Sequence, residues 1–333
     1  MRRLTAAAAV AATLLVVPPA ANAGFAFERA FGQPGGGPYG FGFPLRGPNL
    51  FRTYKSPTGV SVDPAGNLWV ADALNSRIAR FSPAGVYIGR LHARGHGIRP
   101  IRSNILPGAV FRPEGLVWNA GHLFVAMNGN DRIEEFTFTG RLLRIFSVRR
   151  PYRLFFGLSR GSARGQVQNP FGIARRAGIT YVADLNNSRV NVYGPTGASR
   201  GQIGGFGQGP GRFVAPFGVA IGPDGSVYVS DRELNRIQRF SRTGRLIQVI
   251  GSTGSGPGQF LSPWGLATDR RGNLYVADLN NYRVQRLTGS GQFLEAFGQG
   301  LLQSPTYVAV DGACHVYVSD YRRVVKFRST GGC

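Results

Sequence analysis

Short apolar runs separated by polar turns recur six times along this chain. Each copy opens with Pro-x-Gly and a β-branched run, then continues through a turn, an aromatic-Val-Ala/Ser-Asp segment and Arg-Val/Ile. The copies begin at Pro57, Pro113, Pro170, Pro216, Pro263 and Pro305, with a period of 42 to 57 residues. A repeat of this length, made of short strands and Gly-rich turns, is typical of a β-propeller blade. The pattern therefore predicts an all-β, six-bladed β-propeller, with repeats that start near residues 56, 112, 169, 215, 262 and 304.

The fifth copy predicts four strands, which we name a to d from the innermost outward. They are expected at residues 264–269, 273–278, 283–287 and 292–297. Each run is short, rich in Val, Ile and aromatic residues, and bounded by Gly, Asn, Asp or Pro. This arrangement serves as the template for the other five blades.

The sixth copy lacks a strand d of its own. It stops after strand c, at Val324–Phe327, whereas the sequence Phe-Glu-Arg-Ala-Phe-Gly at 27–32 resembles Phe-Leu-Glu-Ala-Phe-Gly at 293–298. We therefore expect the N-terminal strand, residues 25–32, to pair in the last blade and to close the ring. Closure removes the sheet edges that an open array would expose to aggregation.

The alternating direction of the strands divides the loops between two faces. The a–b and c–d turns share one face, which we call the bottom, whereas the b–c turns and the connections to the next blade share the top face. Cys314 and Cys333, the two cysteines of the chain, both fall on the bottom. We expect a disulfide between them that pins the C-terminus as a structural staple.

Residues 1–23 have the features of a cleaved export signal. Arg2 and Arg3 form a positive start, residues 6–17 are apolar, and Ala21-Asn22-Ala23 is a small-x-small cleavage site. We expect cleavage after Ala23 and a secreted or cell-envelope protein. Residues 24–333 then form a single propeller domain. No later apolar run reaches the length of a membrane span, so none is predicted.

The charge balance is strongly positive. The chain has 39 Lys and Arg residues against 16 Asp and Glu residues, a net charge of +23. Nearly all of the positive charge is arginine, because Lys55 and Lys326 are the only lysines. A GC-rich genome would account for arginine in place of lysine, but it does not account for so few acids. Arginine binds carboxylate and phosphate through a two-pronged fork, so the balance favours an anionic partner.

The motifs of the six copies resemble NHL repeats. They include Pro-x-Gly-Val/Ile/Leu-Ala, Gly-Asn-Leu-Tyr-Val-Ala-Asp, Asn-Asn-x-Arg-Val, and Gly-Gly-Phe-Gly-Gln-Gly-Pro-Gly-Arg-Phe at 204–213. The resemblance covers residues 56–327 and implies a six-bladed propeller that acts as a binding platform. Such domains are built into RNA-binding proteins, ubiquitin-ligase accessories and the extracellular sensors of bacterial kinases. Two positions depart from the pattern: Met127 replaces a recurrent aspartate, and Tyr307 replaces the glycine of the opening motif.

An aspartate at the end of strand b recurs together with an arginine that follows it in nearly every copy. A catalytic pair would not need to appear so often, so we interpret these pairs as structural: the aspartate caps the b–c turn, and the arginine bridges neighbouring strands or blades. They are Asp72/Arg77, Asp184/Arg189, Asp231/Arg236 and Asp278/Arg283.

A variable position follows the opening proline of each copy, at the top of strand a. Around the ring it is occupied by Thr58, Glu114, Phe171, Phe217, Trp264 and Thr306. Three adjacent aromatics with a carboxylate beside them form a candidate ligand-binding site at the channel mouth, because aromatic rings stack on sugars, bases and side chains. The alternative is that these side chains pack between the blades and seal the core.

The connections after the first and second copies are long and basic. They carry Arg94, Arg99, Arg102, Arg144, Arg149, Arg150, Arg153 and Arg160, and aromatic residues such as Tyr152 and Phe155 lie between the arginines of the second connection. Basic residues interleaved with aromatics predict an anion-binding ridge above the top face. The alternative is a solvated loop whose aromatics fold back on blade two.

These features favour a secreted, non-enzymatic binding module. Its top face would engage an extracellular anionic polymer, glycan or protein; nucleic acid is a further possibility, and we expect a monomer. No catalytic residue, cofactor or metal site is predicted, because the four histidines are scattered and no Cys/His spacing suits zinc.

Two alternatives to a binding module stay open. One is a six-bladed lyase or hydrolase with a metal at the channel mouth, because 66–70 and 78–81 also resemble the streptogramin lyases and because lactonases share the architecture. Glu114 is the one acid in the mouth ring, which is thin support for such chemistry. The other is a structural envelope protein that uses the propeller as a spacer.

Overall fold

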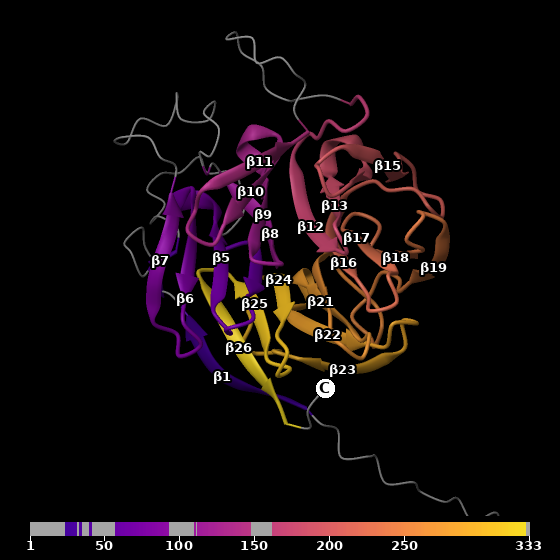
Figure 1. Cartoon of the computed structure of the whole chain (residues 1–333). Coiled ribbons are helices and arrows are strands. Elements are labelled where there is room, and N and C mark those ends of the chain that lie inside the picture. Colours follow the sequence, from indigo (N-terminus) through magenta and orange to yellow (C-terminus); the bar gives the residue numbers. More distant parts are fainter. Residues whose placement is uncertain are drawn as a thin grey trace, which may run out of the picture.

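Six four-stranded antiparallel sheets surround a central axis in the computed structural model (Figure 1). The structure describes residues 24–31, 33–34, 40–41, 57–92, 110, 112–147 and 162–330. Strand a of each sheet lies nearest the axis and strand d lies outermost. The predicted all-β, six-bladed propeller is thus confirmed.

The first three blades follow one another along the chain. Blade one contains β4 (Val60–Val62), β5 (Leu68–Asp72), β6 (Arg77–Phe81) and β7 (Tyr87–His92); blade two contains β8 (Pro113–Asn119), β9 (His122–Met127), β10 (Arg132–Thr137) and β11 (Leu142–Phe146); and blade three contains β12 (Pro170–Arg176), β13 (Ile179–Asp184), β14 (Arg189–Tyr193) and β15 (Ser199–Gly204). The short pair β2 (Gln33–Pro34) and β3 (Gly40–Phe41) lies outside the six blades.

The other three blades complete the ring. Blade four contains β16 (Pro216–Ile221), β17 (Val227–Asp231), β18 (Arg236–Phe240) and β19 (Leu246–Ile250); blade five contains β20 (Pro263–Thr268), β21 (Leu274–Asp278), β22 (Arg283–Leu287) and β23 (Phe293–Phe297); and blade six contains β24 (Pro305–Val310), β25 (Val316–Asp320), β26 (Arg323–Ser329) and β1 (Phe25–Phe31). The four strands predicted for blade five agree with these bounds to within one residue.

The N-terminal strand closes the ring in blade six, as predicted. In Figure 1 the indigo β1 lies beside the yellow β26, and the two pair antiparallel from Phe25 opposite Ser329 to Phe31 opposite Val324. Glu28 accepts a hydrogen bond from Lys326 Nζ at 2.9 Å. Phe25 stacks on Phe297 of blade five with ring centroids 4.5 Å apart, and the buried Phe31 packs against blade one. The closing strand therefore holds three blades together.

The glycine of the opening motif lets neighbouring inner strands approach closely. A Cβ atom on Gly115 would lie 2.2 Å from the carbonyl oxygen of Phe171 in the next blade, and one on Gly218 would lie 2.2 Å from that of Trp264. No side chain fits such a contact, so the fold itself requires this glycine. Blade six carries Tyr307 at the same position, and its side chain enters the channel.

Three of the four recurrent Asp–Arg pairs, in blades one, three and five, are buried ion pairs that hold loops in place, whereas the half-buried Arg236 of blade four donates to the carbonyl oxygens of Gly209 and Arg212. In blade five, Arg283 Nε donates to Asp278 at 2.9 Å, and the second carboxylate oxygen accepts from Leu261 N at 2.8 Å in the connection that enters the blade. A buried charge is tolerated when it is paired and hydrogen-bonded in this way. These contacts account for the pairs without any catalytic role.

Blade two replaces the missing aspartate with a carboxylate from another position. Arg132 lies 2.5 Å from Glu134, which is fully buried two residues further along the same strand. Asp131 accepts a hydrogen bond at 2.7 Å from Asn169 N in the connection to blade three, as Asn235 does from Ser262 N in blade four. The Met127 departure therefore moves the ion pair of the arginine to Glu134.

Four sequence predictions lie wholly or partly outside the described residues. These are the export signal at 1–23, the final residue of the closing strand, Cys333, and most of the arginine ridge. Cys314 lies buried in the a–b turn of blade six, and the described part of the chain holds no free cysteine. The Cys314–Cys333 pairing stays a prediction. Within the described residues, no helix is long and apolar enough to cross a membrane.

Candidate functional site

The six predicted mouth residues lie together around the top of the channel, each at the start of a strand a. All six are buried, and none is more than 5% exposed: Thr58, Glu114, Phe171, Phe217, Trp264 and Thr306. The structure therefore brings the set together as predicted, but presents it as an interior layer.

The three aromatic residues of this layer pack on one another. The ring centroids of Phe171 and Phe217 lie 4.5 Å apart, and those of Phe217 and Trp264 also lie 4.5 Å apart in an edge-to-face arrangement. The cluster continues to the buried Tyr307 of blade six. Such contacts stabilise a core, which is the packing alternative that the sequence left open.

The two threonines of the layer join neighbouring strands. Thr58 Oγ1 donates to the carbonyl oxygen of Pro113 at 3.0 Å, which links blade one to blade two. On its other side, the carbonyl oxygen of Thr58 accepts a hydrogen bond from Ser319 Oγ of blade six. Thr306 Oγ1 contacts the carbonyl oxygen of Ser319 at 3.4 Å. Thr58 thus links blade one to both of its neighbours, whereas Thr306 joins two strands within blade six.

Glu114 is the exceptional member of the layer. Its side chain is 0% exposed, and neither carboxyl oxygen has a hydrogen-bond partner among the described residues. Burial raises its pKa to about 8, although the nearby Arg112 and the Thr58 hydroxyl act in the opposite direction. At neutral pH the group is therefore mostly protonated, which lowers the cost of burying it.

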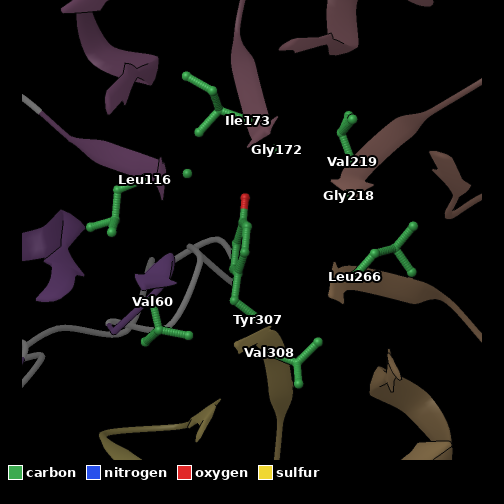
Figure 2. A pocket seen from close by; sticks show the side chains of 10 residues that line it. Val60, Leu116, Gly172, Ile173, Gly218, Val219, Leu266, Tyr307 and Val308 are labelled. Atoms are coloured by element: carbon green, nitrogen blue, oxygen red, sulfur yellow. The ribbon is translucent and has the colours of Figure 1, made fainter. Parts of the chain in front are cut away.

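A small cavity lies in the channel below this layer (Figure 2). Valine, leucine and isoleucine side chains from all six blades surround it, and the Tyr307 side chain stands in their midst (Figure 2). The volume available to water is about 40 Å³, which is room for one or a few water molecules. Tyr307, in place of a sixth glycine, therefore fills much of the channel that the other five blades leave open.

Arg232 belongs to the same region and was missed by the sequence reasoning. Its guanidinium carbon lies 5.3 Å from the ring centroid of Phe217 and 5.3 Å from that of Trp264. The side chain is 32% exposed, so a cation covers the aromatic layer and still meets solvent. A signal was present: the residue after the recurrent aspartate is Leu185 in blade three and Leu279 in blade five, but arginine in blade four.

The predicted arginine ridge falls almost wholly outside the described residues. Of its eight arginines only Arg144 is described, and it lies within β11 and not in the loop that follows. Its Nε atom is 3.7 Å from Glu135, and it donates a hydrogen bond to the carbonyl oxygen of Pro195 in blade three. Arg144 is therefore a contact between outer strands. Arg94, Arg99, Arg102, Arg149, Arg150, Arg153 and Arg160 keep their assignment as a prediction.

Positive and negative side chains are segregated between the surface and the interior. All 16 acids lie within the described residues, and 11 of them are buried. Only Asp224 and Glu233 are exposed, and each has an arginine within 4 Å. Eleven arginines of the described chain are exposed: Arg90, Arg141, Arg164, Arg176, Arg200, Arg212, Arg242, Arg245, Arg270, Arg271 and Arg328.

The exposed arginines occupy both faces of the ring. Arg164 and Arg212 lie in top-face connections. Most of the others lie in or beside bottom-face turns, including Arg242 and Arg245 in blade four and Arg270 and Arg271 in blade five. Because so few exposed acids oppose them, the surface potential is positive over both faces.

Two segments of the chain match the family model of the NHL repeat, at residues 54–81 and 260–287. They fall in blades one and five of a ring with six such blades. The chain therefore contains NHL repeats. No curated protein matches its sequence.

Several solved structures share the fold at low sequence identity. A gluconolactonase from Xanthomonas campestris is 16% identical, with a TM-score of 0.60 over 82% of this chain and 86% of its own. A virginiamycin B lyase from Staphylococcus aureus is 15% identical, with a TM-score of 0.52 over 79% and 77%. A chain of a nidogen–laminin complex is 17% identical, with a TM-score of 0.56 over 77% and 84%. At these identities the likeness concerns the fold alone.

Proposed function

We propose that this NHL-repeat protein is an exported, non-enzymatic binding module whose arginine-rich surface holds an anionic polymer, glycan or protein outside the cell. The observation that carries the proposal is the segregation of charge: eleven exposed arginines against two exposed acids in the described chain. The acids stabilise loops inside the blades, so they do not neutralise the surface.

The physical consequence is long-range attraction for polyanions. Arginine forms forked hydrogen bonds with carboxylates and phosphates, and a surface of one sign concentrates counter-ions of the other. Binding of this kind weakens as salt is added, because screening shortens the reach of each charge. The rigid ring supports it by holding the arginines at fixed spacing.

The face that binds can be decided with two sets of substitutions. We place the principal site on the top face, at the predicted ridge. Replacing Arg149, Arg150 and Arg153 by serine should then lower the salt concentration that elutes the protein from an acidic polymer. The matched control replaces three exposed arginines of the bottom face, Arg242, Arg270 and Arg271, by serine. If the control variant alone elutes early, the bottom face binds and the top-face assignment is wrong.

A lyase or hydrolase is the second candidate, and Glu114 is the observation that favours it. A buried carboxyl with a pKa near 8 at the top of the channel has the perturbed titration that is frequent at catalytic sites. The fold is shared with a gluconolactonase and a lyase, but also with a chain of a nidogen–laminin complex, so fold alone does not choose. Among the described residues, no three His, Cys, Asp or Glu side chains are grouped to hold a metal ion.

Metal analysis separates the two candidates. The binding module should purify without a stoichiometric calcium or zinc ion, and Glu114→Gln should leave its polymer retention unchanged. A stoichiometric ion that is lost in Glu114→Gln would favour the enzyme.

A further inference from the structure

Two consecutive top-face connections have the same backbone but different exposed side chains. The first joins blade three to blade four, over residues 205–215, and the second joins blade four to blade five, over residues 252–262. The sequence of the first, Gly-Phe-Gly-Gln-Gly-Pro-Gly-Arg-Phe at 205–213, corresponds to Ser-Thr-Gly-Ser-Gly-Pro-Gly-Gln-Phe at 252–260.

The hydrogen bonds of the two connections correspond one to one. Phe213 N donates to Gly205 O at 2.9 Å, and Phe260 N donates to Ser252 O at 2.8 Å. Gly207 N and Gly254 N likewise donate to the carbonyl oxygens of Phe213 and Phe260. Gln238 of blade four and Gln285 of blade five each accept from a loop glycine. Each blade thus holds its own connection rigidly.

The first connection exposes an aromatic ring that the fold does not need. Phe206 is 77% exposed, the highest exposure among the large apolar residues of the described chain. The same backbone position in the second connection holds Thr253, which accepts a hydrogen bond from Asn235 at 3.2 Å. Since the loop forms equally well with threonine, the phenylalanine has no structural reason to be there.

The same connection carries an exposed cation. A Cβ atom on Gly205 would lie 3.0 Å from Arg212 Nη1, and one on Gly207 would lie 3.1 Å from Arg212 Cβ, so the Arg212 side chain runs along both neighbours of Phe206. The corresponding Gln259 instead turns back and accepts from Gly256 N at 3.0 Å. At both positions the second connection has a side chain that accepts a hydrogen bond, whereas the first connection has an exposed side chain.

We infer that Phe206 and Arg212 form a binding subsite for an acidic polysaccharide, with Phe206 against a sugar ring and Arg212 on a carboxylate of the same polymer. An exposed aromatic face packs on the apolar side of a sugar, and a guanidinium in the same connection binds a uronate through two parallel hydrogen bonds. The inference rests on the proposed function and names the partner class. A single-stranded nucleic acid would call for a series of aromatics along a groove, whereas this connection offers one.

The sister connection supplies substitutions that preserve the loop. The double variant Phe206→Thr/Arg212→Gln carries the residues of the second connection, so it should melt at the wild-type temperature. Its affinity for polygalacturonate should fall by about tenfold or more, and its affinity for polyacrylate, which has carboxylates without sugar rings, by clearly less. The reciprocal variant Thr253→Phe/Gln259→Arg should gain affinity for polygalacturonate.

The outcomes are distinct. If wild-type protein binds polygalacturonate and the double variant binds equally well, the subsite is wrong while the binding module stands. If the affinities of the double variant for the two polymers fall equally, the site recognises charge alone and the sugar assignment is overturned. Preferential loss of single-stranded DNA binding would replace the polysaccharide with nucleic acid. If wild-type protein binds no polyanion, the proposed function itself fails.

Discussion

The interior and the surface of this ring use charged side chains in opposite ways. Inside, Asp278 and Arg283 are buried, and Arg283 Nε lies 2.9 Å from one carboxylate oxygen of Asp278. The other carboxylate oxygen accepts a hydrogen bond from Leu261 N, in the loop that enters the blade. On the surface, Arg270 and Arg271 are among eleven exposed arginines of the described chain, against two exposed acids. The difference teaches that the scarce acids serve the fold, whereas the surplus arginines are available for a partner. The following experiments change one side of this contrast at a time.

The largest effect should follow loss of the closing strand. Deleting residues 24–31 removes strand d of blade six and exposes its hydrogen-bonding edge, together with the Phe31 contacts to blades one and six. We expect loss of the cooperative thermal transition, because the ring is one closed unit. Phe27→Ser is the control, since Phe27 is in the same strand but 52% exposed. A deletion variant that melts like wild-type protein would contradict ring closure.

The second effect concerns the buried Glu114 and is dependent on pH. The unfolded chain loses this proton near pH 4.5, but the folded protein holds it up to about pH 8. The contribution of Glu114 to the free energy of unfolding therefore falls as the pH rises from about 4.5 to about 8, and it is constant above about pH 8. The loss is on the order of 5 kcal/mol. Glu114→Gln should remove it.

Denaturant unfolding at pH 5 and at pH 8 measures the Glu114 effect. The free energy of unfolding of Glu114→Gln should exceed that of wild-type protein at pH 8, and the two should be close at pH 5. An equal difference at both values of pH would show that the carboxyl is not held protonated in the folded state.

The third experiment compares one interior pair with one surface pair. Asp278→Ala leaves Arg283 buried without its carboxylate, and about 3–5 kcal/mol of unfolding free energy should be lost. Asp224→Ala removes the partner of Arg239 in a pair whose aspartate is 50% exposed, so the loss should be about 1 kcal/mol or less. Urea denaturation of both variants gives the two values. Similar losses would remove the distinction between interior and surface charge.

Much of the fold could be predicted from the sequence because the same pattern of strands and turns recurs six times. The missing strand in blade six and its replacement at 27–32 followed from the same repeat. Side-chain contacts between strands were harder to foresee: Glu134 replaces the aspartate lost at Met127 through a contact that spacing alone does not show. Arg144 was assigned to a loop because the sequence does not mark where β11 begins.

The candidate site was only partly predictable, for a related reason. Pattern placed the six mouth residues at the top of strand a, but it could not say whether their side chains meet solvent or one another. Tyr307 was recognised as a departure, yet its position inside the channel depends on the glycines that the other five blades have there, of which Figure 2 labels Gly172 and Gly218. Phe206 and Arg212 lay within a repeat motif, and only the matching connection at 252–260 shows that they are dispensable to the loop.

The smallest effect on stability should come from the surface arginines. Replacing Arg270 and Arg271 by serine should change the free energy of unfolding by about 0.5 kcal/mol or less, because neither side chain is buried or paired. Thermal unfolding in moderate salt is the measurement. A loss of several kcal/mol would mean that these arginines serve the fold after all.

The most direct test of the account is the affinity of the protein for polygalacturonate over a series of salt concentrations. If surplus surface arginines bind the polymer, the logarithm of the binding constant should fall steeply with the logarithm of the salt concentration, while the melting temperature of the protein hardly changes. Affinity that is independent of salt, or no binding at low salt, would contradict the account.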